Sequence, residues 1–191
     1  MRRLAALVFA ALLCAAAGAC AGSEKPKPQV AAPALPRTAW IVGANGAVAG
    51  QASFTEGPHG VLIRLLFVSG ALSPGWHGLH FHSVGNCSDP AAGFQASGGP
   101  VGMGPRVRHG LMNPQGPEDG DLPNIFAPPI GPFGAEILAP HVTLAAAEHR
   151  ARLLDADGSA LVIHAGPDDQ VSQPVGGAGP RVACAALTTL P

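Results

Sequence analysis

Glycine and proline are so frequent in this chain that they restrict its fold more than any other feature. The 191 residues include 26 glycines and 20 prolines, and both residue types are costly inside helices, which argues against a helical bundle. Disorder also fits poorly, because 47% of the residues are hydrophobic and the formal net charge is only -1. A loop-rich, mostly β globular domain remains. Because basic residues are not in excess, the chain lacks the positive charge that a nucleic-acid-binding protein usually has.

The N-terminus has the pattern of an export signal. Arg2 and Arg3 precede an apolar run over residues 4–17, which is typical of a secretory signal peptide. We therefore expect residues 1–20 to be a signal peptide. It ends either at an ordinary small-residue cleavage site or at a bacterial lipobox, in which Cys20 would be lipidated and would tether the protein to a membrane. Both alternatives predict the periplasm or cell envelope of a bacterium.

The rest of the chain divides into a spacer and one domain. Residues 21–38 are rich in Ala, Pro and Lys and are expected to be a linker, which leaves residues 39–191 as a domain with room for one core. Its two cysteines, Cys87 and Cys184, would pair by default in an oxidising compartment. Closing so long a loop contributes about 4 to 5 kcal/mol in the chain-entropy model. Two unrelated thiols are the alternative.

Short apolar runs between turn residues predict strands. Residues 40–42 and 47–54 flank Asn45 and Gly46, a hairpin signal, and further runs at residues 60–68 and 160–164 are rich in β-branched side chains. This pattern favours an antiparallel sandwich or a Greek-key barrel.

A long irregular stretch interrupts these strands. Residues 86–133 have Gly or Pro every few positions, and an irregular segment of that length inside a compact domain is usually functional.

Three histidines have the spacing of a metal site. His80 and His82 lie two apart in a predicted strand, so both imidazoles face one side, about 6 to 7 Å apart along the chain. His164 ends a separate apolar strand shortly before Asp168. Three imidazoles suit copper or zinc, and a ligand histidine needs an acceptor for its other nitrogen, for which Asp168 is placed. The alternative is a set of structurally hydrogen-bonded histidines.

Five motifs appear in order along the chain. They are HGLHFHSVGNC from His77, RHG at 108–110, GDLPN at 120–124, ALVIHAGPDD at 160–169 and GPRVACA at 179–185. Over about residues 47–187 the sequence resembles the copper/zinc superoxide dismutases, in particular their exported bacterial branch. The resemblance implies an all-β fold, an eight-stranded Greek-key β-barrel or sandwich with long loops.

The resemblance also implies a role for each matching residue. His80, His82 and His164 correspond to copper ligands, and Arg181 corresponds to the guanidinium that docks superoxide beside the copper. Further correspondences are Asp168 and His77 as residues behind the copper ligands, His109 and Asp121 as two zinc ligands, and Cys87 and Cys184 as the intrasubunit disulfide.

Two positions depart from the family pattern. Pro100 stands where the family has a histidine that bridges copper and zinc, and Glu118 stands where it has a further zinc histidine. Proline offers no side-chain ligand, so the bridge cannot form. Zinc would keep only His109, Asp121 and at best Glu118, whereas structural zinc sites normally have four ligands dominated by Cys and His. We therefore expect copper as the cofactor and no zinc.

The resemblance implies a copper-dependent oxidoreductase that converts superoxide, its small-molecule partner, to oxygen and hydrogen peroxide. Because Pro100 removes the bridging histidine, the alternative is a catalytically weak or inactive copper-binding or sequestering protein on the same fold. Met103 and Met112 flank the altered loop, and thioethers favour Cu(I). The sequence does not specify the oligomeric state.

Overall fold

The computed structural model describes residues 36–104, 107–144 and 149–188; the predicted signal peptide, with Cys20, and the linker up to residue 35 lie outside the described residues. The described part is built of strands, with two single-turn 3-10 helices, η1 (Pro90–Ala92) and η2 (Gln95–Ser97). None of its helices is long and apolar enough to cross a membrane. The strands are β1 (Arg37–Gly43), β2 (Val48–Gly57), β3 (Gly60–Phe67), β4 (Gly75–His77), β5 (Leu79–His82), β6 (Ile125–Ala127), β7 (Phe133–Ala139), β8 (Val142–Thr143), β9 (Ala151–Arg152), β10 (Ser159–His164) and β11 (Arg181–Leu187).

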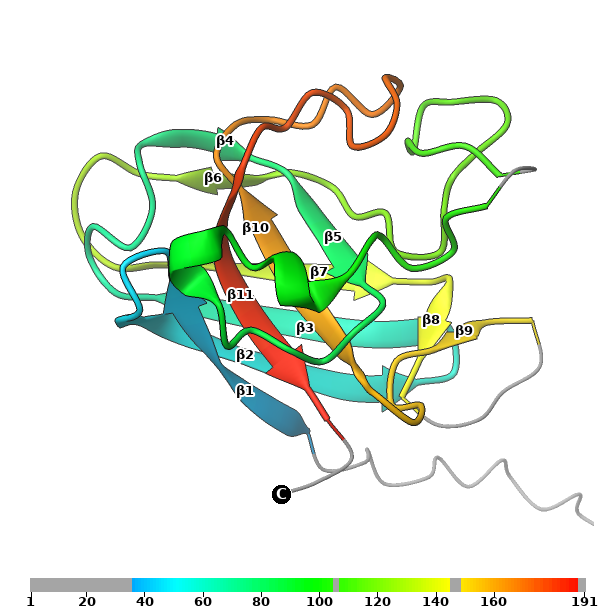
Figure 1. Ribbon diagram of the computed structural model, residues 1–191, viewed down its shortest axis with the longest axis horizontal. Helices are drawn as coiled ribbons and strands as arrows, with labels where there is room; N and C mark the ends of the chain where they lie inside the picture. The colour runs from blue at the N-terminus through cyan, green and yellow to red at the C-terminus, as the bar shows by residue number, and fades with distance from the viewer. Residues whose placement is uncertain (1–35, 105–106, 145–148, 189–191) are drawn as a thin grey trace, which may run out of the picture. The chain divides into compact units, whose positions relative to one another are not determined.

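Seven strands form one curled sheet in the order β5-β10-β11-β1-β2-β3-β7, and each neighbouring pair is antiparallel (Figure 1). Strands β4 and β5 are separated only by Gly78 and have different partners, since β4 pairs with β6 and β5 with β10. They form the two halves of one bent strand. Counted in this way, the bent strand and β6 complete the predicted eight-stranded all-β Greek-key fold. Strands β8 and β9 add a short parallel pair.

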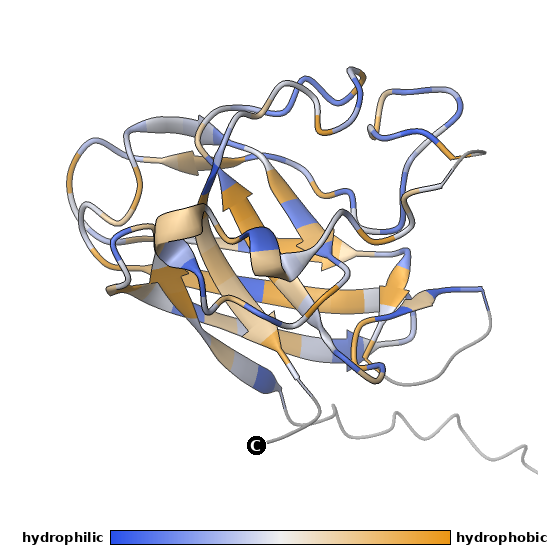
Figure 2. Ribbon diagram, in the orientation of Figure 1, coloured by the Kyte–Doolittle hydropathy of each residue, from blue (hydrophilic) through white to orange (hydrophobic). Residues whose placement is uncertain are grey.

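The core follows the two-residue period of the strands. In β3, Ile63 and Leu65 are fully buried while Leu62 and Arg64 are exposed, because successive side chains point to opposite faces. Figure 2 shows the resulting bands of hydrophobic residues along the strands. Each fully buried aliphatic or aromatic side chain contributes roughly 1.5 to 3 kcal/mol.

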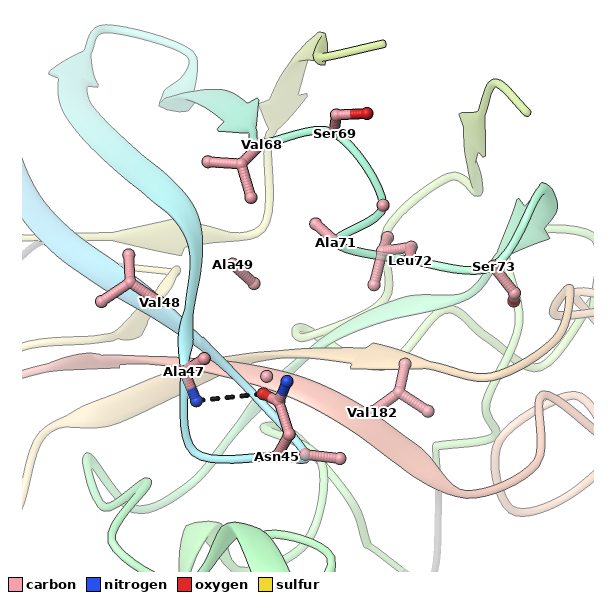
Figure 3. Close-up of a pocket in the computed structure, with 13 residues that line it drawn as sticks. Asn45, Ala47, Val48, Ala49, Val68, Ser69, Ala71, Leu72, Ser73 and Val182 are labelled. Atoms are coloured by element: carbon pink, nitrogen blue, oxygen red, sulfur yellow. Dashed lines mark hydrogen bonds between the residues drawn. The ribbon is translucent and has the colours of Figure 1, made fainter. Parts of the chain in front are cut away.

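The predicted hairpin forms between β1 and β2. Asn45 turns the chain, and its side-chain oxygen accepts a hydrogen bond from the backbone N–H of Ala47 at 3.0 Å. A hollow of about 520 Å³ lies beside this turn and is lined by the hairpin, the segment after β3 and Val182 (Figure 3). None of its lining residues carries an acidic, basic, histidine or cysteine side chain.

Strand β10 is buried on both faces. All six of its residues are buried, because the inner face joins the barrel core while the outer face lies under the segment that follows β5. Phe94 of that segment packs against Ala160, Val162 and Cys184. A second, smaller core therefore holds the loop against the outside of β10 and β11, and the candidate site lies in this layer.

Candidate metal centre

Two neighbouring strands bring the three predicted copper ligands together. Leu79 and Phe81 of β5 enter the barrel core, so His80 and His82 face the outside. His80 pairs with Val162 of β10, and His164 lies two residues further along on the same face. One ring nitrogen from each of the three histidines lies within 4.8 Å of the other two, and all three side chains are buried. The grouping predicted from the sequence is present.

One nitrogen of each ring is fixed by an acceptor. Nε2 of His80 lies 2.7 Å from Oδ2 of Asp168. Nδ1 of His82 lies 2.9 Å from the carbonyl oxygen of Gly98, and Nδ1 of His164 lies 2.9 Å from that of Gly179. A carbonyl or an ionised carboxylate only accepts, so each of these nitrogens carries the hydrogen.

The other three nitrogens have no partner. Nδ1 of His80, Nε2 of His82 and Nε2 of His164 are buried and make no hydrogen bond within the described part of the chain. With the hydrogen on the opposite nitrogen, each carries a free lone pair. Unsatisfied buried polar atoms are rare unless a ligand takes them up, and three imidazole nitrogens form a donor set that suits copper. The residues present therefore fit copper.

Burial keeps two of these rings neutral. Removal from water lowers the pKa of His82 to about 3 and that of His164 to about 4, with a further lowering from the positive charge of Arg181. A metal binds only the deprotonated nitrogen. At neutral pH the two rings are therefore in the form that binds a metal.

Arg181 shares a pocket with these rings. A hollow of about 420 Å³ is lined by His82, His164 and Arg181, together with Pro100 and Met103. Nη1 of Arg181 donates to the carbonyl oxygen of Phe94 at 2.8 Å and to Oγ of Ser97 at 3.0 Å. Burial lowers the pKa of the guanidinium, which starts so high that the group stays charged. The pocket thus presents one fixed cation beside the unpartnered nitrogens.

The predicted disulfide is confirmed. Cys87 and Cys184 are bonded, with their Cα atoms 5.7 Å apart. The bond ties the segment after β5 to β11, and this is the segment that supplies Phe94 and Ser97 to Arg181.

The two residues expected behind the copper ligands, His77 and Asp168, lie next to His164 and His80. Nδ1 of His77 lies 2.7 Å from the carbonyl oxygen of His164, and its Nε2 lies 2.8 Å from that of Ser73. Asp168 is held by Asn124, which accepts from the backbone N–H of Asp168 at 2.9 Å and donates to its carbonyl at 2.8 Å. That His77 and Asp168 orient a bound metal stays a prediction.

A second cluster surrounds His109. Its Nδ1 lies 2.6 Å from Oδ1 of Asp121, and its Nε2 lies 3.0 Å from Oδ2 of Asp168. His109, Asp121 and His80 also bring one potential ligand atom each within 4.8 Å of one another. Burial alone would lower the pKa of His109, but the hydrogen bonds and charges of Asp121 and Asp168 raise it to about 10.

Glu118 lies beside this second cluster. Its side chain is only 3% exposed, and its Oε2 is buried with no hydrogen-bond partner among the described residues. Burial, and then the negative charge of Asp121, raise the pKa of Glu118 to about 7. In the absence of a metal, the Glu118 carboxyl is therefore harder to ionise than an exposed glutamate.

Several residues of the site escaped the sequence analysis. Asn124 belongs to the GDLPN motif, so the sequence marked this residue, but it did not show that Asn124 would hold Asp168. The backbone acceptors at Gly98 and Gly179 leave no side-chain signal. Gly176 has φ +58°, and a Cβ there would overlap Oδ1 of Asp168, so only glycine leaves room for that carboxylate.

The structure also separates the two methionines of the altered loop. Met103 lines the pocket of His82 and Arg181, whereas Met112 lines a different hollow next to Trp76. Only Met103 is placed to influence a metal bound by the three unpartnered nitrogens.

Comparisons with known proteins agree with this geometry. The family model described as copper/zinc superoxide dismutase matches residues 48–187. A superoxide dismutase [Cu-Zn] of Caulobacter vibrioides is 48% identical over 150 residues, which cover 78% of this chain and 84% of that protein. Superoxide dismutase [Cu-Zn] 2 of Aquifex aeolicus is 39% identical over 151 residues, covering 77% and 83%.

Solved structures show the same fold. The SOD-like protein from Bacillus subtilis superposes with a TM-score of 0.71 at 30% identity, covering 82% of this chain and 99% of that one. The Cu/Zn superoxide dismutase from Brucella abortus gives a TM-score of 0.59 at 28% identity, covering 80% and 99%. With the family match over most of the described domain, this chain belongs to the copper/zinc superoxide dismutase family.

Proposed function

We propose that the protein is a copper-only superoxide dismutase of the bacterial cell envelope. The observation that carries the proposal is a group of three buried histidines, His80, His82 and His164, which bring one ligand atom each within 4.8 Å of the others and each keep one ring nitrogen unpartnered. Two of them share a pocket with Arg181. Two superoxide anions and two protons give one molecule of oxygen and one of hydrogen peroxide. Copper, when bound, supplies the electron transfer by alternating between Cu(II) and Cu(I).

Arg181 binds and orients the anion. Its guanidinium is held by Phe94 and Ser97 on the wall of the pocket that His82 and His164 also line. A unit anion about 4 Å from it gains on the order of 1 to 4 kcal/mol, depending on how much water remains. Because Pro100 has no titratable group, the two protons come from water in the pocket.

We do not expect zinc to bind, because the residues that match the family zinc site supply an incomplete set of donors. Pro100 supplies no ligand atom. His109 and Asp121 lie at hydrogen-bond distance from each other, and Glu118 is held towards its neutral form because its pKa is raised to about 7. Too few donors remain for the four-ligand site that structural zinc prefers.

The proposed location rests on the N-terminal sequence and on the disulfide. Arg2 and Arg3 with the following apolar run indicate export, and Cys87–Cys184 is the kind of bond that persists in oxidising compartments. Metabolic labelling with a fatty-acid analogue distinguishes lipidation from ordinary cleavage. Cys20→Ser abolishes the label if Cys20 is the attachment site and changes nothing if it is not.

The enzymatic proposal is tested on copper-loaded protein assayed with EDTA present, which masks free copper. We expect dismutation that EDTA does not suppress, and a rate about tenfold lower in Arg181→Gln, because the fixed cation that draws in the anion is lost. A rate no greater than that of copper and EDTA without protein would overturn the proposal.

One observation favours a second candidate, a protein that holds copper without turnover. Met103 lines the same pocket as His82 and His164, and a thioether prefers Cu(I). A copper-holding protein would keep Cu(I) in the presence of superoxide and oxygen, and Met103→Leu would weaken its Cu(I) binding. A dismutase would be reoxidised within the assay, and Met103→Leu would leave its rate unchanged.

A further inference from the structure

The pocket in front of the predicted copper ligands carries a charge that opposes the entry of a metal ion. It is lined by His82 and His164 together with Arg181, and none of the described residues that line it is acidic. Coulomb repulsion grows with the product of the charges, so the guanidinium repels a divalent ion twice as strongly as a monovalent one. Of the two oxidation states of copper, Cu(I) therefore meets the weaker repulsion on its way to the unpartnered nitrogens.

The same pocket offers one soft donor. Met103 lines it together with His82 and His164, and a thioether is a soft ligand that selects Cu(I). The Met103 side chain is 53% exposed, whereas His82 and His164 are at most 2% exposed. An ion that arrives from solvent therefore meets the Met103 side chain before it meets the buried ring nitrogens.

A tight turn brings Met103 to this position. Pro100 pairs with His82 in an isolated antiparallel bridge. The backbone N–H of Met103 donates to the carbonyl oxygen of Pro100 at 3.4 Å, and Gly102 between them has φ +88°, the positive φ that a type II turn requires at its third residue. The chain therefore reverses directly after Pro100, and Met103 returns towards the residue that lies opposite His82.

The thioether then lies over a glycine backbone. A Cβ on Gly99 would stand 3.4 Å from Cε and 3.7 Å from Sδ of Met103, which is the distance of ordinary van der Waals contact. The carbonyl oxygen of the preceding residue, Gly98, accepts from Nδ1 of His82 at 2.9 Å. One short stretch of backbone thus holds the His82 ring by its Nδ1 and carries the sulfur into the pocket that this ring lines.

We infer that copper enters this protein as Cu(I), and that Met103 is an entry ligand, which takes the ion from its donor and passes it to His82 and His164. The donor is a Cu(I) complex whose ligands the thioether displaces, and the ion keeps its charge throughout. The inference rests on the proposed copper-dependent function and adds how the metal is loaded. An entry ligand speeds uptake and release alike, so it changes rates and not affinity. This distinguishes it from the permanent Met103 ligand of the copper-holding candidate.

The test measures copper uptake by the metal-free protein with its disulfide intact, without oxygen, from the coloured bicinchoninate complex of Cu(I). In Met103→Leu, uptake should be about tenfold slower, which corresponds to a barrier higher by about 1.36 kcal/mol, while the equilibrium affinity for Cu(I) should not change. Met103→Gln, which replaces the sulfur by a hard amide, should be as slow. Uptake of Cu(II) from its glycine complex should be the same in all three proteins.

Met112→Leu is the matched control. Met112 is 75% exposed, more than Met103, but it lines a different hollow. If the position of the thioether matters and not merely its exposure, Met112→Leu should take up Cu(I) at the wild-type rate.

Four results would overturn the inference. They are wild-type Cu(I) uptake in both Met103 variants, equal slowing in Met112→Leu, equal slowing of Cu(II) uptake, and a weaker equilibrium affinity in Met103→Leu, which would make the thioether a permanent ligand. The melting temperature of each metal-free variant checks its fold, and Met103→Gln decides if Met103→Leu does not fold. Slow uptake in the Met103 variants of a protein that does not dismutate superoxide would overturn the proposed enzymatic function and leave the entry ligand supported.

Discussion

The two histidine clusters of this protein share Asp168 but use their donor atoms in opposite ways. In the first, each ring of His80, His82 and His164 has one nitrogen fixed by an acceptor and one without a partner. In the second, both nitrogens of His109 and both oxygens of Asp121 are engaged. The first cluster therefore leaves three lone pairs free, whereas the donor atoms of the second are taken up by hydrogen bonds among its own residues and Asp168.

Removing one ligand of the first cluster should have the largest effect. His164→Ala deletes the nitrogen contributed by β10, so we expect copper affinity to fall by more than about 100-fold, beyond the range for residues that only support a ligand. The measurement is chelator competition, with His141→Ala as the matched control. Unchanged copper affinity in His164→Ala would place the copper elsewhere.

Restoring two histidines should convert the second cluster into a zinc site. Pro100→His with Glu118→His supplies the donors that the family pattern has, and a bound metal at 100 times its Kd stabilises the native state by about 2.7 kcal/mol. We expect zinc to raise the melting temperature of the double variant but not that of Pro100→His alone. A double variant indifferent to zinc would mean that more than these two residues closes the site.

A methyl group at Gly176 should disturb both clusters at once. In Gly176→Ala the new Cβ meets Oδ1 of Asp168, so His80 and His109 lose their shared acceptor. Gly177→Ala is the matched control, because it has a similar φ of +65° but nothing within 4 Å of its Cβ. The control should cost about 1 to 2 kcal/mol through backbone strain, and Gly176→Ala about 1 to 3 kcal/mol more. Equal unfolding free energies for the two variants would show that Asp168 tolerates displacement.

The last prediction concerns the dependence of stability on pH through Glu118. Its pKa rises from 4.5 to about 7 on folding, so the unfolded state loses this proton first and stability falls as pH rises through that window. Glu118→Gln removes the titration. It should therefore be more stable than the wild type at pH 8 and nearly equal at pH 4.5, by chemical denaturation. A stability difference that does not change with pH would show that burial of Glu118 costs nothing.

Local pattern was enough to predict most of the fold. The two-residue alternation of β3 and the Asn45-Gly46 turn are local signals, and both appear in the structure as expected. The bend at Gly78 and the burial of β10 on both faces are not local. They depend on β4 and β5 choosing different partners and on Phe94 arriving from a distant loop.

The candidate site was predictable only as far as its side chains carry a signal. His80, His82, His164, Asp168 and Arg181 stand in recognisable motifs, and the structure gathers them. The acceptors that set the tautomers, the carbonyls of Gly98 and Gly179, look like any other backbone group in the sequence. The sequence identified His109 and Asp121 only as matches to two zinc ligands. Their hydrogen bond to each other, and that of His109 to Asp168, could not be predicted because separate loops must meet in space to form them.

The contrast between the clusters is tested most directly by a crystal structure of the protein offered copper and zinc together, with diffraction recorded at the absorption edges of both metals. We predict one anomalous peak, at the copper edge, between His80, His82 and His164, with Nδ1 of His109 still at hydrogen-bond distance from Asp121. A zinc peak between His109 and Asp121, with those two atoms moved apart, would contradict it.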